Sequence, residues 1–270
     1  MRRLTDRQRL ALVRARARPD AGFLDAEAAL MVQERLTEVN RTFTSPALVA
    51  PRPEAFGFLN AVTVPDDEVL DLTPGAHDLV VHAMGLHWAD DPVGQLIQCR
   101  RALAPDGLFL GVMLGGRTLQ ELRAVLAEAE TAATGGLSPR VAPMAEIRDL
   151  GALLFRAGLA LPVADGLALD VSYRDLRHLA ADLRAMGEGN ALADRGPPLS
   201  RAALDHADRL YATHFGRDDG RITATFELIF LTGWAPHDSQ QRPLRPGSAA
   251  HRLAEALGTE EVGTGVPTLK

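Results

Sequence analysis

The sequence predicts an α/β fold built on a parallel sheet. The clearest sign is a strand–helix–strand unit over residues 77–114, in which the short apolar runs Asp78–Val81 and Leu108–Leu114 flank a helical stretch. Apolar runs without alternation are typical of strands that are covered on both faces. A second sign is the run Ile222–Trp234, whose β-branched and aromatic residues favour a further strand.

The helix of this unit has residues suited to its two ends. Asp91 is placed to cap its N-terminus, and Pro92 opens its first turn. An apolar stripe follows and extends to Leu103. The run 104–107, Ala-Pro-Asp-Gly, is expected to end the helix.

The N-terminal region, residues 1–43, is predicted to be helical. Its first part, residues 1–18, is rich in arginine and carries spaced leucines, which suggests an amphipathic helix with a basic face. Such a helix either packs against the domain with its charges in solvent or contacts an acidic partner or a membrane surface. A second helix, over residues 23–43, leads into the first strand.

The remaining elements alternate between helix and strand. Periodicity predicts helices over 118–131 and 144–157 and strands over 167–173 and 222–234. Residues 174–215, between the last two strands, are helical and polar, and we interpret them as an inserted lid or partner surface. The α/β domain is therefore assigned to residues 44–257. The tail, residues 258–270, lacks periodicity and is predicted to be mobile.

Composition excludes several classes of protein. The formal net charge of −6 argues against general binding of nucleic acid. A single cysteine, Cys99, excludes an internal disulfide framework and a cysteine-based metal site. Apolar runs are too short for a transmembrane segment, and the N-terminus lacks the apolar stretch of a secretory signal. We expect a cytoplasmic bacterial protein.

Residues 78–111, DLVVHAMGLHW…RRALAPDGLFLG, resemble the fourth strand, following helix and fifth strand of class I S-adenosylmethionine-dependent methyltransferases. Downstream segments resemble a narrower family, the methyltransferase-fold assembly factor of respiratory complex I and its bacterial relatives. These segments are GGRTLQELRAVLAEAE, GGLSPRVAP, DLGALLFRAG, MGEGNA and TFELIFLTGW. The resemblance implies a Rossmann-like sheet, S-adenosylmethionine as cofactor, and hydroxylation of an arginine on a complex I subunit.

The cofactor region departs from that family. Its members carry a glycine-rich loop of the form acid-Leu-Gly-x-Gly-x-Gly, where this chain has residues 47–55, ALVAPRPEA, with Val49 in place of the acid. Prolines lack an N–H and fill space that glycine leaves open. Residues 47–78 also hold one strand–helix unit fewer than the superfamily. We therefore predict a sheet truncated in its N-terminal half, and weak or no binding of S-adenosylmethionine.

One remnant of the cofactor site is suggested by the same resemblance. Residues 62–64 match the third strand of the superfamily, and Asp66 and Asp67 match its acidic end, which faces the adenine. An acidic turn in solvent is the alternative interpretation.

The segments after the two central strands are the first candidates for a functional site, because ligands bind beyond the carboxyl ends of the strands in such sheets. His87 could act as a general base and Trp88 could stack on a planar group; both could instead be structural. Residues 115–118, with Arg117, precede a helix, so their N–H groups suit an anion. The alternative there is a capping box between Thr118 and Glu121.

Glu188 and Asn190 lie in a glycine-containing turn and suit recognition of a guanidinium group. An ordinary helix end is the alternative. No residue is assigned a catalytic role, and no spacing typical of a metal site occurs. Two functions follow: a pseudoenzyme that binds a protein partner such as a complex I subunit, or an active S-adenosylmethionine-dependent methyltransferase or arginine-modifying enzyme. The missing glycines favour the first.

Overall fold

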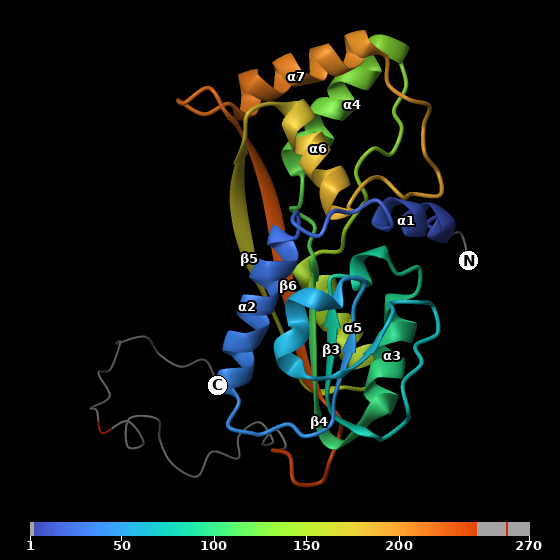
Figure 1. The fold of residues 1–270 in the computed structure, drawn as a ribbon, viewed down its shortest axis with the longest axis vertical. Helices are drawn as coiled ribbons and strands as arrows, with labels where there is room; N and C mark the ends of the chain where they lie inside the picture. The colour runs from blue at the N-terminus through green and yellow to red at the C-terminus, as the bar shows by residue number, and fades with distance from the viewer. Residues whose placement is uncertain (1–2, 242–257, 259–270) are drawn as a thin grey trace, which may run out of the picture. The chain divides into compact units, whose positions relative to one another are not determined.

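The strands of the described part of the chain form one six-stranded sheet (Figure 1). The computed structural model describes residues 3–241 and residue 258. The strands are β1 Pro46–Val49, β2 Val62–Val64, β3 His77–Ala83, β4 Leu103–Leu114, β5 Ala160–Tyr173 and β6 Ile222–Trp234. Their order is β2-β1-β3-β4-β6-β5, with β6 antiparallel to both of its neighbours and the other pairs parallel.

The chain divides into two units, Met1–His237 and Asp238–Lys270. The sheet and its helices belong to the first unit. The predicted mobile tail lies outside the described residues, apart from Gly258.

The front half of the sheet is short, as the sequence predicts. Between β1 and β3 the chain forms one 3-10 helix, η1 (Pro53–Leu59), and β2, which pairs with β1 in parallel. β3 and β4 are adjacent and parallel, with Leu79 opposite Leu108. The predicted α/β class and the truncation are thus confirmed.

Helices cover both faces of the sheet. They are α1 Arg7–Arg14, α2 Phe23–Glu38, η2 Leu86–Trp88, α3 Pro92–Ala102, α4 Gln120–Thr134, α5 Ile147–Arg156, α6 Leu176–Met186 and α7 Arg201–Phe215. Leu96 of α3 and Leu154 of α5 belong to the core on one face. The other face packs against α2, α4, α6 and α7. In the described part of the chain, no helix is both long and apolar enough to cross a membrane.

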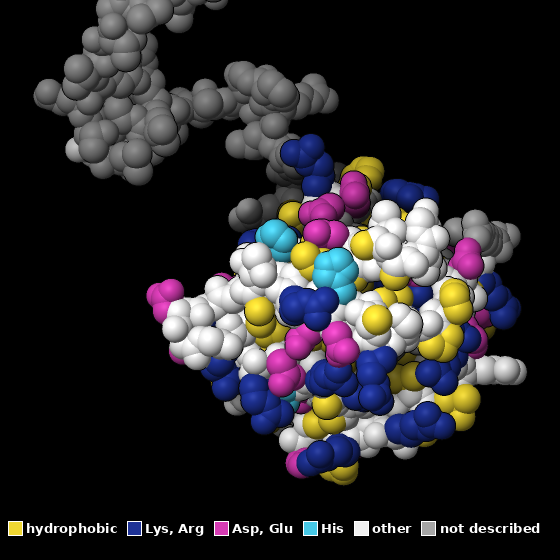
Figure 2. Space-filling view, turned by 90° about the horizontal axis from the view of Figure 1, so that it is seen from above, with side chains coloured by type: hydrophobic (Ala, Val, Ile, Leu, Met, Phe, Trp, Pro, Cys, Tyr) yellow, Lys and Arg dark blue, Asp and Glu magenta, His cyan; other side chains and the backbone are white. Residues whose placement is uncertain are grey.

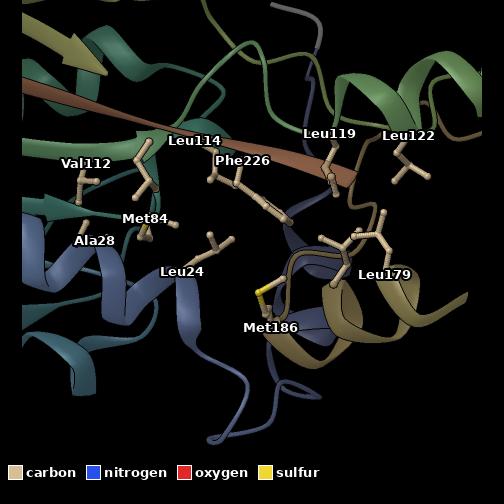
Figure 3. Packing of buried hydrophobic residues seen from close by; sticks show 14 of the residues in the cluster. Leu24, Ala28, Met84, Val112, Leu114, Leu119, Leu122, Leu179, Met186 and Phe226 are labelled. Atoms are coloured by element: carbon tan, nitrogen blue, oxygen red, sulfur yellow. The ribbon is translucent and has the colours of Figure 1, made fainter. Parts of the chain in front are cut away.

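The helical insertion shares the core of the second face. Figure 3 shows Leu24 of α2, Met84 at the end of β3, Leu179 and Met186 of α6, and Phe226 of β6 converging in one cluster. Each is buried, and such a side chain contributes about 1.5–3 kcal/mol through burial. This packing holds α6 over the carboxyl ends of the strands.

Most element boundaries agree with the sequence, and the exceptions have local causes. Asp91 caps α3 by accepting a hydrogen bond from the Gly94 N–H at 2.8 Å, as predicted. The helix ends one residue before Leu103, which already belongs to β4. The predicted helix from residue 118 begins later because Leu119 is left-handed, with φ of 55°.

Candidate functional site

The segments that follow β1, β2, β3 and β4 meet at the carboxyl ends of the strands, because these strands are parallel. They are residues 50–52, 65–67, 84–88 and 115–118. Each segment is bound by a side chain from elsewhere in the chain, as described below.

At the end of β3, η2 places His87 and Trp88 against Glu188. The Trp88 Nε1–H donates a hydrogen bond to Glu188 Oε2 at 2.9 Å, and His87 Nε2 lies 3.3 Å from the same oxygen. The His87 ring is fully buried, and its Nδ1 has no hydrogen-bond partner among the described residues. Burial opposes ionisation of Glu188, but His87, Arg14 and the Trp88 N–H together hold its pKa below the usual value.

The turn that carries Glu188 is also the end of α6. Gly187 adopts φ of 83°, and the Glu188 N–H donates to Leu183 O at 2.9 Å, so the helix-end interpretation is correct as well. Asn190 does not join Glu188. Its Nδ2 donates to the carbonyls of Pro139 and Arg140, and its Oδ1 accepts from the Leu192 N–H. This amide therefore fixes the surrounding loops.

The N–H groups of residues 115–118 are all engaged within the chain. Gly115 and Gly116 donate to the carbonyls of Glu227 and Ala145, and Thr118 donates to Gly115. The Arg117 N–H donates to the Glu227 carboxylate at 3.0 Å. An internal carboxylate thus takes the place of the expected anion.

The predicted capping box is wrong. The Thr118 hydroxyl accepts from the Glu227 N–H at 3.0 Å instead of capping α4. The Glu121 carboxylate accepts from Thr225 of β6. Both side chains bind the neighbouring strand, because the left-handed Leu119 turns the chain before the helix starts.

A cavity of about 190 Å³ lies beside the Trp88–Glu188 bond. Trp88, Glu188 and Asn190 line it together with apolar residues such as Phe226 and with the exposed Arg184. Arg117 is exposed and does not line it. The structure therefore brings His87, Trp88 and Glu188 together and leaves Arg117 apart.

After β1, the position of the glycine loop is filled by Arg52 between two prolines. Its guanidinium donates to the carbonyls of Met186 and Arg18, each at 3.2 Å, and lies 3.4 Å from Asp25 Oδ2. Burial raises the pKa of Asp25 to about 6, although Arg52 opposes this shift. A cavity of about 790 Å³ opens beside this pair, between residues 14–26 and 51–55.

After β2, Asp66 is buried and bound by the N-terminal helix. Arg14 forms a bidentate ion pair with its carboxylate, with N···O distances of 2.8 and 3.0 Å. Arg7 donates to the Asp66 carbonyl at 2.6 Å and lies 3.7 Å from Asp67. The Asp67 side chain is 69% exposed, as expected for an acidic turn in solvent.

The N-terminal segment, residues 3–18, also contacts the segments at the carboxyl ends of the strands. The Thr5 hydroxyl donates to Trp88 O at 2.9 Å, and the Asp6 N–H donates to Ala191 O at 2.8 Å. An isolated β-bridge joins Thr5 to Leu192. Residues 3–18 thus connect the strand ends to the loop after α6.

These residues do not fit S-adenosylmethionine in the way that the resemblance implies. Prolines and Arg52 stand where glycine N–H groups would approach a ligand, and Arg14 neutralises Asp66. The described part of the chain also contains no cluster of His, Cys, Asp or Glu suited to a metal ion.

Sequence reasoning missed Arg14, Asp25, Arg52 and Glu227. Arg7 and Arg14 are seven residues apart and so share a helix face, which was the available signal for α1. The partners of the other three lie far away in the sequence, and no local pattern identifies them.

No family model matches the chain. The mitochondrial arginine-hydroxylase NDUFAF5 of Danio rerio is 39% identical over 190 residues, which cover 70% of this chain and 59% of that protein. The Homo sapiens protein is also 39% identical, with 70% and 55% covered. The chain therefore spans little more than half the length of these relatives.

A bacterial relative is matched over more of its length. The malonyl-(acyl-carrier protein) O-methyltransferase of Halorhodospira halophila is 31% identical over 235 residues, which cover 82% of this chain and 74% of that protein. Together with the truncated Rossmann-like sheet, these relatives confirm the resemblance. The chain belongs to the methyltransferase-fold family that includes the NDUFAF5 arginine hydroxylases and the bacterial malonyl-(acyl-carrier protein) O-methyltransferases.

Proposed function

We propose that this protein is a methyltransferase-fold pseudoenzyme that binds a protein partner, a subunit of respiratory complex I during its assembly. The observation that carries the proposal is the filling of the cofactor region by two internal ion pairs, Arg14–Asp66 and Arg52–Asp25. The partner class comes from the resemblance to complex I assembly factors.

The ion pairs oppose S-adenosylmethionine through charge. The ligand carries a net positive charge, and Asp66 and Asp25, the carboxylates that could bind it, are already paired with Arg14 and Arg52. Breaking a buried ion pair costs about 3–5 kcal/mol. This cost is as large as the whole binding free energy at millimolar affinity, about 4 kcal/mol. Binding in the millimolar range or weaker follows.

The surface around the Trp88–Glu188 bond is the proposed partner site. Its cavity is lined by apolar residues and by polar ones, including Arg184 and Glu188. Figure 2 views the molecule from the end that carries α4, α6 and α7, and shows arginine side chains interspersed with acidic ones. Such a mixed surface suits a protein partner better than a uniformly charged polymer.

An active enzyme is the second candidate, and the Glu188–His87 pair favours it. A carboxylate that orients an imidazole is an arrangement found at general bases, but the fully buried His87 ring would have to become accessible before a substrate could reach it. In that case the chain would use S-adenosylmethionine through an altered site, as a methyltransferase or an arginine-modifying enzyme.

Calorimetric titration of the purified protein with S-adenosylmethionine separates the two candidates. The pseudoenzyme is expected to give no saturable heat at micromolar ligand, and the variant Glu188→Ala should give the same trace. A micromolar dissociation constant would contradict the proposal and favour the enzyme.

A further inference from the structure

The edge of the sheet at β5 is open. β5 is the last strand in the sheet order and pairs with β6 from Val163 to Tyr173 (Figure 1). Its second edge has no strand partner among the residues that the structure describes. Alternate residues of such a strand direct their N–H and C=O groups away from the sheet, where another strand can bind them.

Apolar side chains are exposed on β5 and on the helix α5. The exposed large apolar side chains of β5 and of α5, which packs against it, are Ile147, Phe155, Leu161, Val163 and Leu167. Phe155 is 76% exposed and Val163 is 55% exposed. Edge strands are usually protected by charged residues. Residues 163–169, Val-Ala-Asp-Gly-Leu-Ala-Leu, contain one charge, Asp165, which is bound by Arg35 of α2. The edge is therefore apolar and close to neutral.

We propose that β5 pairs with β5 of a second copy of this chain, antiparallel across a two-fold axis at Gly166. In this register, Val163 faces Leu169 of the second copy and Asp165 faces Leu167 of the second copy. No charge lies directly opposite a like charge. Gly166 meets its own counterpart, and the missing Cβ allows the two backbones to approach closely at the axis.

The near-neutral, apolar character of the β5 edge favours a second copy of this chain over a peptide of another protein. A charged peptide would gain little, because Arg35 already neutralises Asp165. A two-fold contact uses one patch on both copies, so Val163 of each copy is covered by Leu169 of the other. Pro162 and the left-handed Leu161, with φ of 50°, interrupt the regular edge before Val163. Pairing is thus confined to a segment whose sequence suits it.

Light scattering of the full chain after size exclusion tests the proposal. The expected mass is twice the 29.0 kDa of one chain. Val163→Lys is expected to abolish the dimer, because a lysine would face Leu169 of the second copy at two places in the interface. The Val163 side chain is half exposed within one chain, so the melting temperature of the variant should stay close to that of the wild type measured as monomer.

Cross-linking tests the register. Gly166→Cys should form a disulfide-linked dimer on oxidation, since the two cysteines would lie opposite each other. Leu137→Cys, at a loop position that is 69% exposed, is the matched control and should stay monomeric on denaturing gels. The native Cys99 is buried and should not interfere. A monomeric wild type, a dimer that survives Val163→Lys, or equal cross-linking of the two cysteine variants would overturn the proposal.

Discussion

Glu188 accepts a hydrogen bond from the indole N–H of Trp88 at 2.9 Å, although 100 positions separate the two residues in the sequence. Trp88 follows the third strand of the chain, and Glu188 follows the first helix of the insertion. The bond therefore ties the insertion to the carboxyl edge of the sheet, where the proposed partner site lies.

This bond predicts a non-additive effect on stability. Glu188→Ala leaves the buried Trp88 N–H without an acceptor, which should cost about 1–3 kcal/mol in the free energy of unfolding. Trp88→Phe removes the donor and keeps an aromatic ring. The loss of unfolding free energy in the double variant should therefore be smaller than the sum of the losses in the two single variants. Urea denaturation of the four proteins measures this difference, and strict additivity would show that the bond does not stabilise the fold.

Arg14 is expected to matter far more than another arginine of the same region. Arg14→Ala leaves the Asp66 carboxylate buried without its cation, at a cost of about 3–5 kcal/mol. Arg18→Ala is the matched control, because Arg18 and its partner Asp20 are each 66% exposed, and it should cost much less than Arg14→Ala. Chemical denaturation compares them. Similar losses for the two variants would mean that the Arg14–Asp66 pair stabilises the fold no more than the exposed Arg18–Asp20 pair does.

Asp25 should make the protein less stable as the pH rises. Its pKa in the folded protein is about 6, above the ordinary 3.8, so between these values the folded state holds a proton that the unfolded state has lost. The free energy of unfolding therefore falls as the pH rises from about 4 to about 6, by about 3 kcal/mol for this group.

Asp25→Asn provides the test of that linkage. The difference in unfolding free energy between variant and wild type should shift in favour of the variant across the same pH range. Thermal or urea denaturation at pH 4, 5, 6 and 7 gives this difference at each pH. A difference that does not change with pH would place the Asp25 pKa near its ordinary value.

Two glycines at helix ends should respond differently to alanine. Gly187 and Gly135 both adopt the left-handed conformation, which costs about 1–2 kcal/mol for alanine. A Cβ at Gly187 would also lie 3.1 Å from the Ala17 Cβ, whereas a Cβ at Gly135 would meet no atom within 4 Å. Gly187→Ala should therefore lower the melting temperature more than Gly135→Ala does. The reverse order would indicate that residues 14–18 move away from the added Cβ without a loss of stability.

Local patterns predicted most of the sheet, although β5 begins at Ala160 and not at residue 167, and β4 begins at Leu103 and not at Leu108. Apolar runs fixed the positions of β3, β4 and β6, and Asp91 with Pro92 marked the start of α3, because these signals act through nearest neighbours along the chain. The left-handed conformation of Leu119 could not be predicted, since leucine rarely adopts it and no pattern in the neighbouring residues marks it.

The candidate site was predictable only in part. Its location beyond the strand ends follows from topology, and the resemblance supplied Glu188. The resemblance also singled out Asp66, but the sequence gives no sign that Arg14, which is 52 positions away, binds it. Ion pairs of this kind depend on the completed tertiary fold, so a single sequence does not specify them.

The N-terminal segment has a consequence for the order of folding. Asp6 bonds to Ala191 and lies 3.1 Å from Arg195, which is 189 positions further along the chain. Closing a loop of that length requires the intervening domain to be compact first, because the entropy of closure is otherwise uncompensated. Residues 3–18 should therefore dock after the sheet has formed, so that substitutions at Thr5 or Asp6 accelerate unfolding and leave the refolding rate almost unchanged.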